Sequence, residues 1–466
     1  MNNAQYHLII RHRYRCLLAE NRGFALVAVL VISLLLSATL VIILAFVARH
    51  RKLLLEKAED LQTLYLAESA LHRAAADFYS GERALYSRSP RTYSLLLADR
   101  DSARIVQFPW GGYTALLATA GSTPREEMLS ALIAKRPSSA FRPAVIVDPA
   151  AGPLTLAGNA RLTGAVRTGP EGVRAAPPGE RRHRQGIPVY GNIVRRREDG
   201  RPGIQRDLVN EIYREFRARL ARADTLPWLP TISEADSLID LAPGGMLRSY
   251  RLPPGFFHTG PRHIRGPGIL VIEAALTLDK PLRLSHFVSV LCREEIRLDT
   301  AVIADQALFY SPRQIIVAGT GQFRGQLFSE EQITVTGAST LAYPSLLMVY
   351  GNRDESTIRI AAPAEVSGTV LFTSPEHGIN PARQGSGIII EKGATVNGLV
   401  YSGNLLNLGG TINGISVTGR FHFYRSPTDY YNWIRDGTVD RSRLSERFLI
   451  PLFLEPENRN FVPLVE

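Results

Sequence analysis

The sequence predicts a mainly β protein that begins with a long transmembrane α-helix and contains a right-handed parallel β-helix, with a small α/β region between the two. Two observations lead to this fold class. The first is an apolar run near the N-terminus, residues 23–48, which contains no charged residue. The second is a short phrase centred on glycine, which recurs after residue 153 within segments of alternating apolar and polar residues.

The apolar run is long enough to cross a bilayer. Its 26 residues lie between Arg22 and Arg49, and as a helix they span about 39 Å, whereas a hydrocarbon core is about 30 Å thick. A cleaved secretory signal has a shorter apolar region that is followed by small residues. Here bulky Phe46 stands near the end of the run, so we expect a transmembrane helix over residues 24–48.

The segment before the helix, residues 1–23, is a basic leader that ends in glycine. It contains four arginines against the single acidic residue Glu20, and Arg22-Gly23-Phe24 opens the apolar run. This arrangement resembles the type IV prepilin signal, and the resemblance implies cleavage after Gly23 by a prepilin peptidase, which would leave Phe24 as the mature N-terminus. The alternative is an ordinary membrane anchor in which Arg-Gly-Phe occurs by chance.

The fifth mature residue departs from the pattern of major pilins. That position is usually Glu in the family, and here it is Ala28. The absence of this Glu resembles the tip-type minor pseudopilin of type II secretion systems, and the N-terminal region is also similar to PilX-like minor pilins. The resemblance implies that Ala28 bears on assembly with other pilin-like subunits.

The helix is expected to continue to residue 80. Leu54, Ala58, Leu61, Leu71 and Ala75 recur at multiples of three and four, which is typical of one apolar stripe. The segment Ala67-Glu68-Ser69-Ala70-Leu71 resembles the corresponding segment of minor pilins. Residues 24–80 therefore predict one helix of about 84 Å, half in the bilayer and half outside it.

Residues 81–150 predict a small mixed α/β region. Two β-capable runs, 103–108 and 113–120, are separated by the turn signal Pro109-Trp110-Gly111-Gly112. Residues 124–135 have helical character, and residues 144–147 are short and apolar enough to be a buried strand.

The glycine phrase predicts the β-helix, which we expect to begin in residues 151–265 and to fill residues 266–424. In each copy an apolar residue, a spacer, a glycine, a spacer and another apolar residue follow one another, with the glycine at Gly164, Gly325, Gly368, Gly398 and Gly414. A glycine at each sharp corner would let successive turns of chain stack closely. Residues 387–419 resemble bactofilin-like, polymer-forming β-helices. A β-sandwich would show the same alternation without repeating the glycine phrase.

Three further segments have distinct compositions. Residues 171–206 hold nine arginines, including Arg181, Arg182 and Arg184, against four acidic residues, and predict an exposed loop. Residues 207–224 predict an amphipathic helix on the flank of the β-helix. Residues 425–466 are rich in aromatic residues and proline, so we expect them to form a C-terminal cap over the open end.

The composition narrows the possible chemistry. The net charge of +11 comes from arginines spread along the chain, so nucleic acid is an unlikely partner. The two cysteines, Cys16 and Cys292, provide no disulfide framework. We find no Walker motif, no nucleophile elbow and no set of metal ligands, and we predict no catalytic residue, cofactor or metal.

Two other classes of protein remain as alternatives. A β-helix polysaccharide lyase or hydrolase would need converging charged groups, for which Asp299, Asp305, Arg324, Glu330 and Glu331 are the candidates. A membrane-anchored, bactofilin-like scaffold would associate end to end, and a cap over residues 425–466 would block it.

The expectation that combines these features is a non-catalytic minor pilin or pseudopilin-like subunit of a type IV pilus or type II secretion machine, at a filament tip. It would be a single-pass inner-membrane protein with a cytoplasmic N-terminus and most of the chain in the periplasm. Its partners would be the prepilin peptidase, other pilin-like subunits through the N-terminal helix, and the lipid bilayer.

Overall fold

The computed structural model is mainly β, with one long N-terminal apolar helix. It describes residues 3–79, 91–96, 102–122, 125–180, 187–229, 238–242, 247–253, 255–259, 262–299, 302–319, 321–351, 353–375 and 385–465. These form two compact units. One contains Met1–Leu66 with Gly121–Glu127, and the other contains Ala67–Ala120 with Met128–Glu466.

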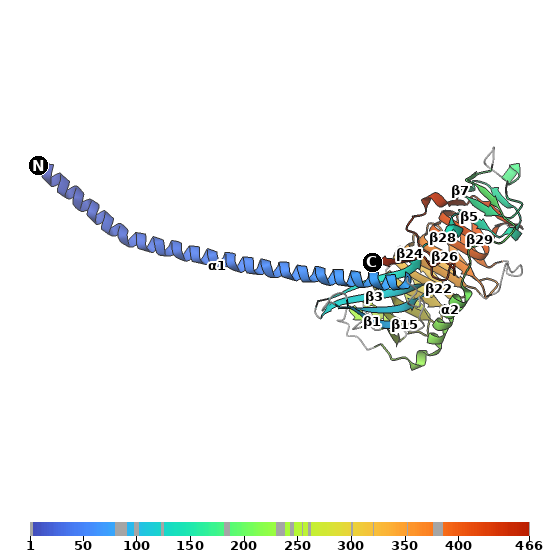
Figure 1. Cartoon of the computed structure of the whole chain (residues 1–466), viewed down its shortest axis with the longest axis horizontal. Coiled ribbons are helices and arrows are strands. Elements are labelled where there is room, and N and C mark those ends of the chain that lie inside the picture. Colours follow the sequence, from blue (N-terminus) through green and yellow to red (C-terminus); the bar gives the residue numbers. More distant parts are fainter. Residues whose placement is uncertain are drawn as a thin grey trace. The chain divides into compact units, whose positions relative to one another are not determined.

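Helix α1 runs without interruption over Asn3–Tyr79 (Figure 1). The expected helix over residues 24–80 is thus present to Tyr79, and it also extends back through most of the leader. Beyond Leu66 one face of α1 is buried in its unit, and the buried side chains are Ala67, Ala70, Leu71, Ala74 and Ala75. Their spacing of three and four places them on one stripe.

The unit that contains the end of α1 also contains a five-stranded sheet. Its strands in spatial order are β1 (Arg91–Leu96), β2 (Ser102–Trp110), β3 (Tyr113–Ser122), β4 (Arg125–Lys135) and β33 (Phe461–Val465). The pairs β1–β2, β2–β3 and β4–β33 are antiparallel. The turn expected between β2 and β3 is present at Gly111-Gly112, and Pro109 and Trp110 belong to β2.

The prediction of a helix over residues 124–135 is wrong, because this segment forms β4. Its partner is the last strand of the chain, in which Phe461 lies opposite Lys135 and Leu464 opposite Leu132. Leu132 and Ile133 are adjacent, so they point to opposite faces of the sheet, and both are buried. A strand that is buried on both faces has a continuous apolar run, which periodicity cannot distinguish from a helix.

The rest of the β structure is a stack of parallel strand pairs, which we call the strand stack. Six long strands run through it, and each pairs in parallel with the next: β20 (Val302–Ser311), β22 (Gln322–Ser329), β24 (Thr340–Tyr350), β26 (Glu365–Thr373), β28 (Thr395–Leu408) and β29 (Thr411–Arg425). The long strands span two rows of paired strands, and shorter strands extend these two rows at either end of the stack and form a third row beside them. In Figure 1, β22, β24, β26, β28 and β29 lie side by side.

The three rows follow the same order along the stack. The first has β12 (Leu238–Asp240), β14 (His263–Arg265) and β17 (Leu282–Ser285) before the long strands. After them come β32 (Thr438–Asp440), β7 (Arg161–Thr163) and β10 (Val189–Tyr190). The second has β13 (Arg248–Arg251), β15 (Gly268–Ile272) and β18 (Val288–Cys292) before the long strands. After them come β5 (Val145–Val147), β8 (Val166–Thr168) and β11 (Ile193–Arg195).

The third row contains β16 (Leu276–Leu278), β19 (Ile296–Leu298), β21 (Gln314–Ala318), β23 (Gln332–Thr336), β25 (Thr357–Ile360) and β27 (Gly387–Ile390), which pairs with the end of β28. A separate parallel sheet contains β31 (Trp433–Arg435), β6 (Leu154–Ala157) and β9 (Val173–Ala175). Aliphatic and aromatic side chains from all three rows form one buried core.

The stacking order differs from the chain order, which corrects two expectations. Strand β29 pairs with β5, so residues 145–195 continue the stack beyond its last long strand and do not begin it. Strand β32 has β29 on one side and β7 on the other, so residues 425–466 do not cap an open end. After β32 the chain returns to the five-stranded sheet through an antiparallel bridge between Ile450 and Lys135.

The expected amphipathic helix is present as α2 (Arg206–Ala221) and packs on the flank of the strand stack. Tyr213 and Phe216 contact the rings of Tyr310 and Phe328, which lie on β20 and β22. Residues 171–206 are only partly a loop, because β9, β10 and β11 lie within them; Arg181, Arg182 and Arg184 fall outside the described residues.

The remaining short elements connect the strands. They are α3 (Phe256–Thr259) and the 3-10 turns η1 (Ser139–Phe141), η2 (Pro149–Ala151), η3 (Pro178–Glu180), η4 (Ala223–Thr225) and η5 (Arg441–Arg443). One further strand, β30 (Thr428–Tyr431), pairs antiparallel with the end of β29 and forms a two-stranded ribbon with it.

Candidate functional site

The predicted processing and assembly residues lie in α1. Gly23, Phe24 and Ala28 are helical, and the side chain of Phe24 is outside the described part of the chain. Among the described residues, a single stretch of helix, Ala25–Asp77 of α1, is long and apolar enough to cross a membrane. The mean hydropathy of its most apolar window is 3.0, and none of that window is buried. This exposure fits a membrane anchor or a signal sequence.

Four of the five glycines of the repeated phrase lie where the backbones of neighbouring strands approach closely, whereas the atoms nearest Gly164 are side-chain atoms of Ala144 and Arg441. Gly325, Gly368, Gly398 and Gly414 lie inside β22, β26, β28 and β29, and Gly164 lies between β7 and β8. A Cβ at Gly398 would lie 1.9 Å from the carbonyl oxygen of Gly368, and one at Gly414 would lie 1.9 Å from that of Gly398. Gly368, Gly398 and Gly414 are also in register. Close approach of backbone to backbone therefore requires glycine at these places.

The carboxylates considered for a glycosidase or lyase bind four different arginines. Asp305 pairs with Arg324 at 2.7 Å and Asp299 with Arg297 at 3.3 Å. Glu330 accepts hydrogen bonds from Arg217 at 2.7 Å and from the Tyr310 hydroxyl at 2.6 Å, and Glu331 pairs with Arg353 at 2.7 Å. Each acid thus has its own cation as a partner, and these contacts do not bring the four together.

A pocket with a volume of about 190 Å³ lies on the side of the strand stack. Its walls come from the segment that precedes α2, from the end of β26 and from the middle of β28, and they include Asp199, Arg201, Phe372, Tyr401 and Asn404. The two walls are far apart in the sequence, so the pocket exists only in the folded chain.

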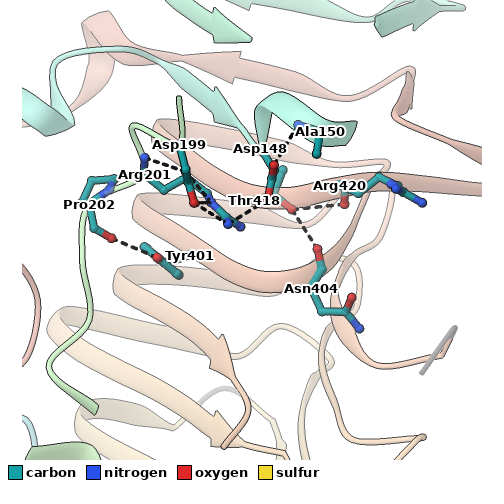
Figure 2. Close-up of polar contacts among 9 residues, drawn as sticks. All are labelled: Asp148, Ala150, Asp199, Arg201, Pro202, Tyr401, Asn404, Thr418 and Arg420. Atoms are coloured by element: carbon teal, nitrogen blue, oxygen red, sulfur yellow. Dashed lines mark hydrogen bonds and ion pairs between the residues drawn. The ribbon is translucent and has the colours of Figure 1, made fainter. Parts of the chain in front are cut away.

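Arg201 connects the segment before α2 to the strand stack (Figure 2). Its guanidinium lies 2.8 Å from Asp148, just after β5, and 2.7 Å from Asp199. Its Nε also donates to Asp199 at 2.9 Å. The Tyr401 hydroxyl donates to the Pro202 carbonyl at 3.0 Å. These contacts hold the segment before α2 against β5 and β28.

The protonation states of the pocket are fixed near neutral pH. Burial alone would raise the pKa of Asp199, but its hydrogen bonds and ion pair with Arg201 outweigh burial and lower that pKa. Burial alone would lower the pKa of Arg201, and Asp199 and Asp148 reverse the effect and raise it. Burial raises the pKa of Tyr401 to about 12. None of these three groups is therefore poised to transfer a proton at pH 7.

Histidines and metal-binding chemistry do not define a site in the described residues. Within them no three His, Cys, Asp or Glu side chains are grouped so that they could hold a metal ion. His263 instead contacts the Ser285 hydroxyl at 2.8 Å, and burial together with Arg283 and Arg265 lowers its pKa. Sequence reasoning missed the cluster of Asp148, Asp199 and Arg201, because the pairing depends on where β5 lies in the stack.

Comparisons with known proteins identify no family. No family model matches this chain, and no curated protein matches it. Among solved structures, the crystal structure of the competence-associated pilin ComZ from Thermus thermophilus is similar over 87% of this chain and 98% of that one, with 11% identity and a TM-score of 0.25. A likeness at this TM-score carries no argument about fold or function.

Proposed function

We propose that this chain is a non-catalytic, pilin-like subunit of a type IV pilus or type II secretion machine, anchored in the inner membrane by α1. The observation that carries the proposal is the continuity of α1. Its exposed apolar half continues without a break into a half whose last turns bury Ala67, Ala70 and Leu71 in the folded head. One helix thus serves both as a membrane segment and as part of the head.

The leader supports a processing step. Arg22-Gly23-Phe24 at the start of the apolar run resembles the prepilin signal, so a prepilin peptidase would cut after Gly23. The positively charged leader would lie in the cytoplasm and the head in the periplasm. Other pilin-like subunits and the bilayer would then contact the exposed apolar face of α1.

Ala28 and the size of the head support a place at the filament tip. In the family the fifth mature residue, Glu, pairs with the N-terminal amine of a neighbouring subunit. A buried charge without such a partner costs several kcal/mol. Ala28 has no carboxylate, and the large head would crowd helices that pack side by side.

We also infer that the strand stack is a right-handed parallel β-helix. Three rows of parallel pairs with a common register support this architecture, as do glycines whose backbones contact from one turn to the next. A turn of chain that contributes one strand to each row is the repeating unit of such a solenoid.

N-terminal sequencing of protein extracted from membranes tests the proposal. In a cell with a prepilin peptidase the mature chain should begin at Phe24, and a Gly23→Ala variant should keep its leader. The matched control is Gly81→Ala, which alters a glycine far from the leader. An intact Met1 in the wild-type protein of such a cell would contradict the pilin assignment and would leave a plain membrane anchor.

A further inference from the structure

The end of β29 and strand β30 form a ribbon that carries exposed aromatic rings. Tyr424 is 53% exposed and Tyr431 is 36% exposed, and the rings of Phe423, Tyr430 and Trp433 are half-buried. Tyr430, Tyr431 and Trp433 belong to the segment, residues 425–466, that the sequence predicts to be a cap. Because no open end lies beneath them, these rings require another explanation.

The rings divide between the two faces of the ribbon. Residues directly opposite each other in an antiparallel pair share a face, and Phe423 lies opposite Tyr430. Their ring centroids are 5.8 Å apart, and that of Trp433 lies 4.9 Å from that of Tyr430. We call these three residues, Phe423, Tyr430 and Trp433, the aromatic platform. His422 and Tyr431 lie on the opposite face, with centroids 5.5 Å apart.

The two arginines next to the aromatic platform share an acidic partner, whereas Arg420 lies over the Tyr431 ring, 5.5 Å from its centre. Glu180 binds both Arg425, at 2.7 Å, and Arg435, at 2.9 Å, and the Arg435 guanidinium lies 5.2 Å from the centre of the Phe423 ring. His422 pairs with Asp429 at 2.7 Å on the other face. A phosphate polymer would have to compete with Glu180 for two guanidinium groups. The ribbon therefore suits an uncharged partner better than a polyanion.

The surroundings of the platform match a sugar better than an aliphatic protein surface. The aliphatic residue nearest in sequence, Ile434, is fully buried. Rings without exposed aliphatic neighbours, bordered by paired polar groups, instead match a sugar ring. Its C–H face can lie on the negative face of an aromatic ring, and its hydroxyls can bond to the polar border.

We propose that the aromatic platform binds an uncharged polysaccharide. Phe423, Tyr430 and Trp433 contact the C–H faces of successive sugars, and Arg425, Arg435 and Glu180 hydrogen-bond their hydroxyls. This binding activity is separate from the filament role and does not depend on it.

Tryptophan fluorescence tests the proposal on the full chain. The protein contains three tryptophans, of which Trp110 is 3% exposed and Trp228 is 52% exposed. In a Trp228→Phe variant, Trp433 is therefore the main tryptophan that iodide can quench. The probes are maltohexaose, cellohexaose and chitohexaose, added to protein in a detergent without a sugar headgroup. We expect at least one of them to protect Trp433 from iodide.

Calorimetric titration with the same oligosaccharides gives the second measurement. Tyr430→Ala and Trp433→Ala should each weaken binding at least about tenfold, while Trp228→Ala, at an exposed ring elsewhere, should change it less than about twofold. Affinity should not change between low and high salt. Thermal unfolding shows which variants remain folded, and the iodide experiment needs no change to the platform.

Three outcomes would overturn the proposal. One is that none of the three oligosaccharides protects Trp433 or gives heat on titration. Another is that Trp228→Ala weakens binding as much as Trp433→Ala does. The third is that only an oligonucleotide binds, with an affinity that falls steeply as salt rises, because this is the behaviour of a phosphate site.

Discussion

Gly398 provides the sharpest test of the close stacking of strands. In a Gly398→Ala variant the new Cβ would lie 1.9 Å from the Gly368 carbonyl oxygen and 3.0 Å from the Phe448 ring. The first contact is with backbone, which cannot rotate away, so β26 and β28 would have to separate by about 1 Å. Overpacking of this kind costs about 1–3 kcal/mol.

Backbone strain adds to this cost. The φ angle of Gly398 is +152°, which L side chains rarely adopt, and such a conformation costs about 1–3 kcal/mol in a residue with a Cβ. Together the two effects should lower the free energy of unfolding by about 2–6 kcal/mol. Gly414→Ala should behave alike, because its Cβ would lie 1.9 Å from the Gly398 carbonyl oxygen.

Gly403 is the matched control, since it lies on the same strand. A Cβ there would be 3.5 Å from the nearest atom, the Phe372 carbonyl oxygen, which is ordinary contact. Gly403→Ala should therefore leave stability within about 0.5 kcal/mol of the wild type. Circular dichroism of the β signal during urea unfolding measures all three variants. Equal midpoints for Gly398→Ala and Gly403→Ala would refute the stacking argument.

Three other predictions concern separate parts of the chain. Lys135 is buried, which lowers its pKa to about 8 from 10.5, so the unfolded chain binds more protons between those values and the unfolding free energy should rise with pH from 8 toward 9. Lys135→Met should remove that rise in a urea titration, and an unchanged slope would contradict the assignment. Arg201→Met should leave Asp148 and Asp199 without their cation and open residues 196–205 to limited proteolysis; Arg353→Met, which breaks a more exposed pair, is the control and should have little effect. Ala28→Glu should allow the subunit to follow others in a filament, so a tag that labels one end in the wild type should appear along the length, and uniform wild-type labelling would exclude the tip role.

The stabilising effect of Lys135 is best measured below pH 9, because burial raises the pKa of the Cys292 thiol from 9.0 to about 11 and stability then falls as pH rises between these values. Two buried tyrosines act in the same direction at higher pH. Burial raises the pKa values of Tyr113 and Tyr310, so the folded chain holds these protons to higher pH than the unfolded chain does. Their contribution therefore lowers stability as pH rises above 10, which is opposite to the effect of Lys135. Below pH 10 these phenols are protonated in the folded chain and largely so in the unfolded one.

Local sequence patterns predicted the elements that depend on near neighbours. The stripe of α2 is visible because Leu208, Ile212, Phe216 and Leu220 repeat at helical spacing, and all four are buried. The glycine phrase is visible because four of its five copies meet the same steric demand, a backbone carbonyl oxygen where a Cβ would lie. Both signals arise within a few residues of chain, where composition and structure are directly related.

Long-range pairing was not predictable in the same way. Segment 125–135 is a strand because residues 461–465 pair with it, and a partner that distant leaves no mark on the local pattern. The cluster of Asp148, Asp199 and Arg201 depends likewise on β5 lying beside β29. Contacts in the folded chain set the stacking order, because any strand with apolar side chains on one face can occupy a given row.

The unusual stacking order explains how the five-stranded sheet can be completed. The strand stack lies in the sequence between β4 and β33, which are neighbours in that sheet. If the stack followed chain order, its first strand β5 and its last strand β32 would lie at opposite ends. Instead β5 and β32 both pair with β29. The chain therefore enters and leaves the stack at the same place, so Ile450 can reach Lys135 and β33 can pair with β4. A folded insert whose ends are close together adds little to the cost of closing the sheet around it.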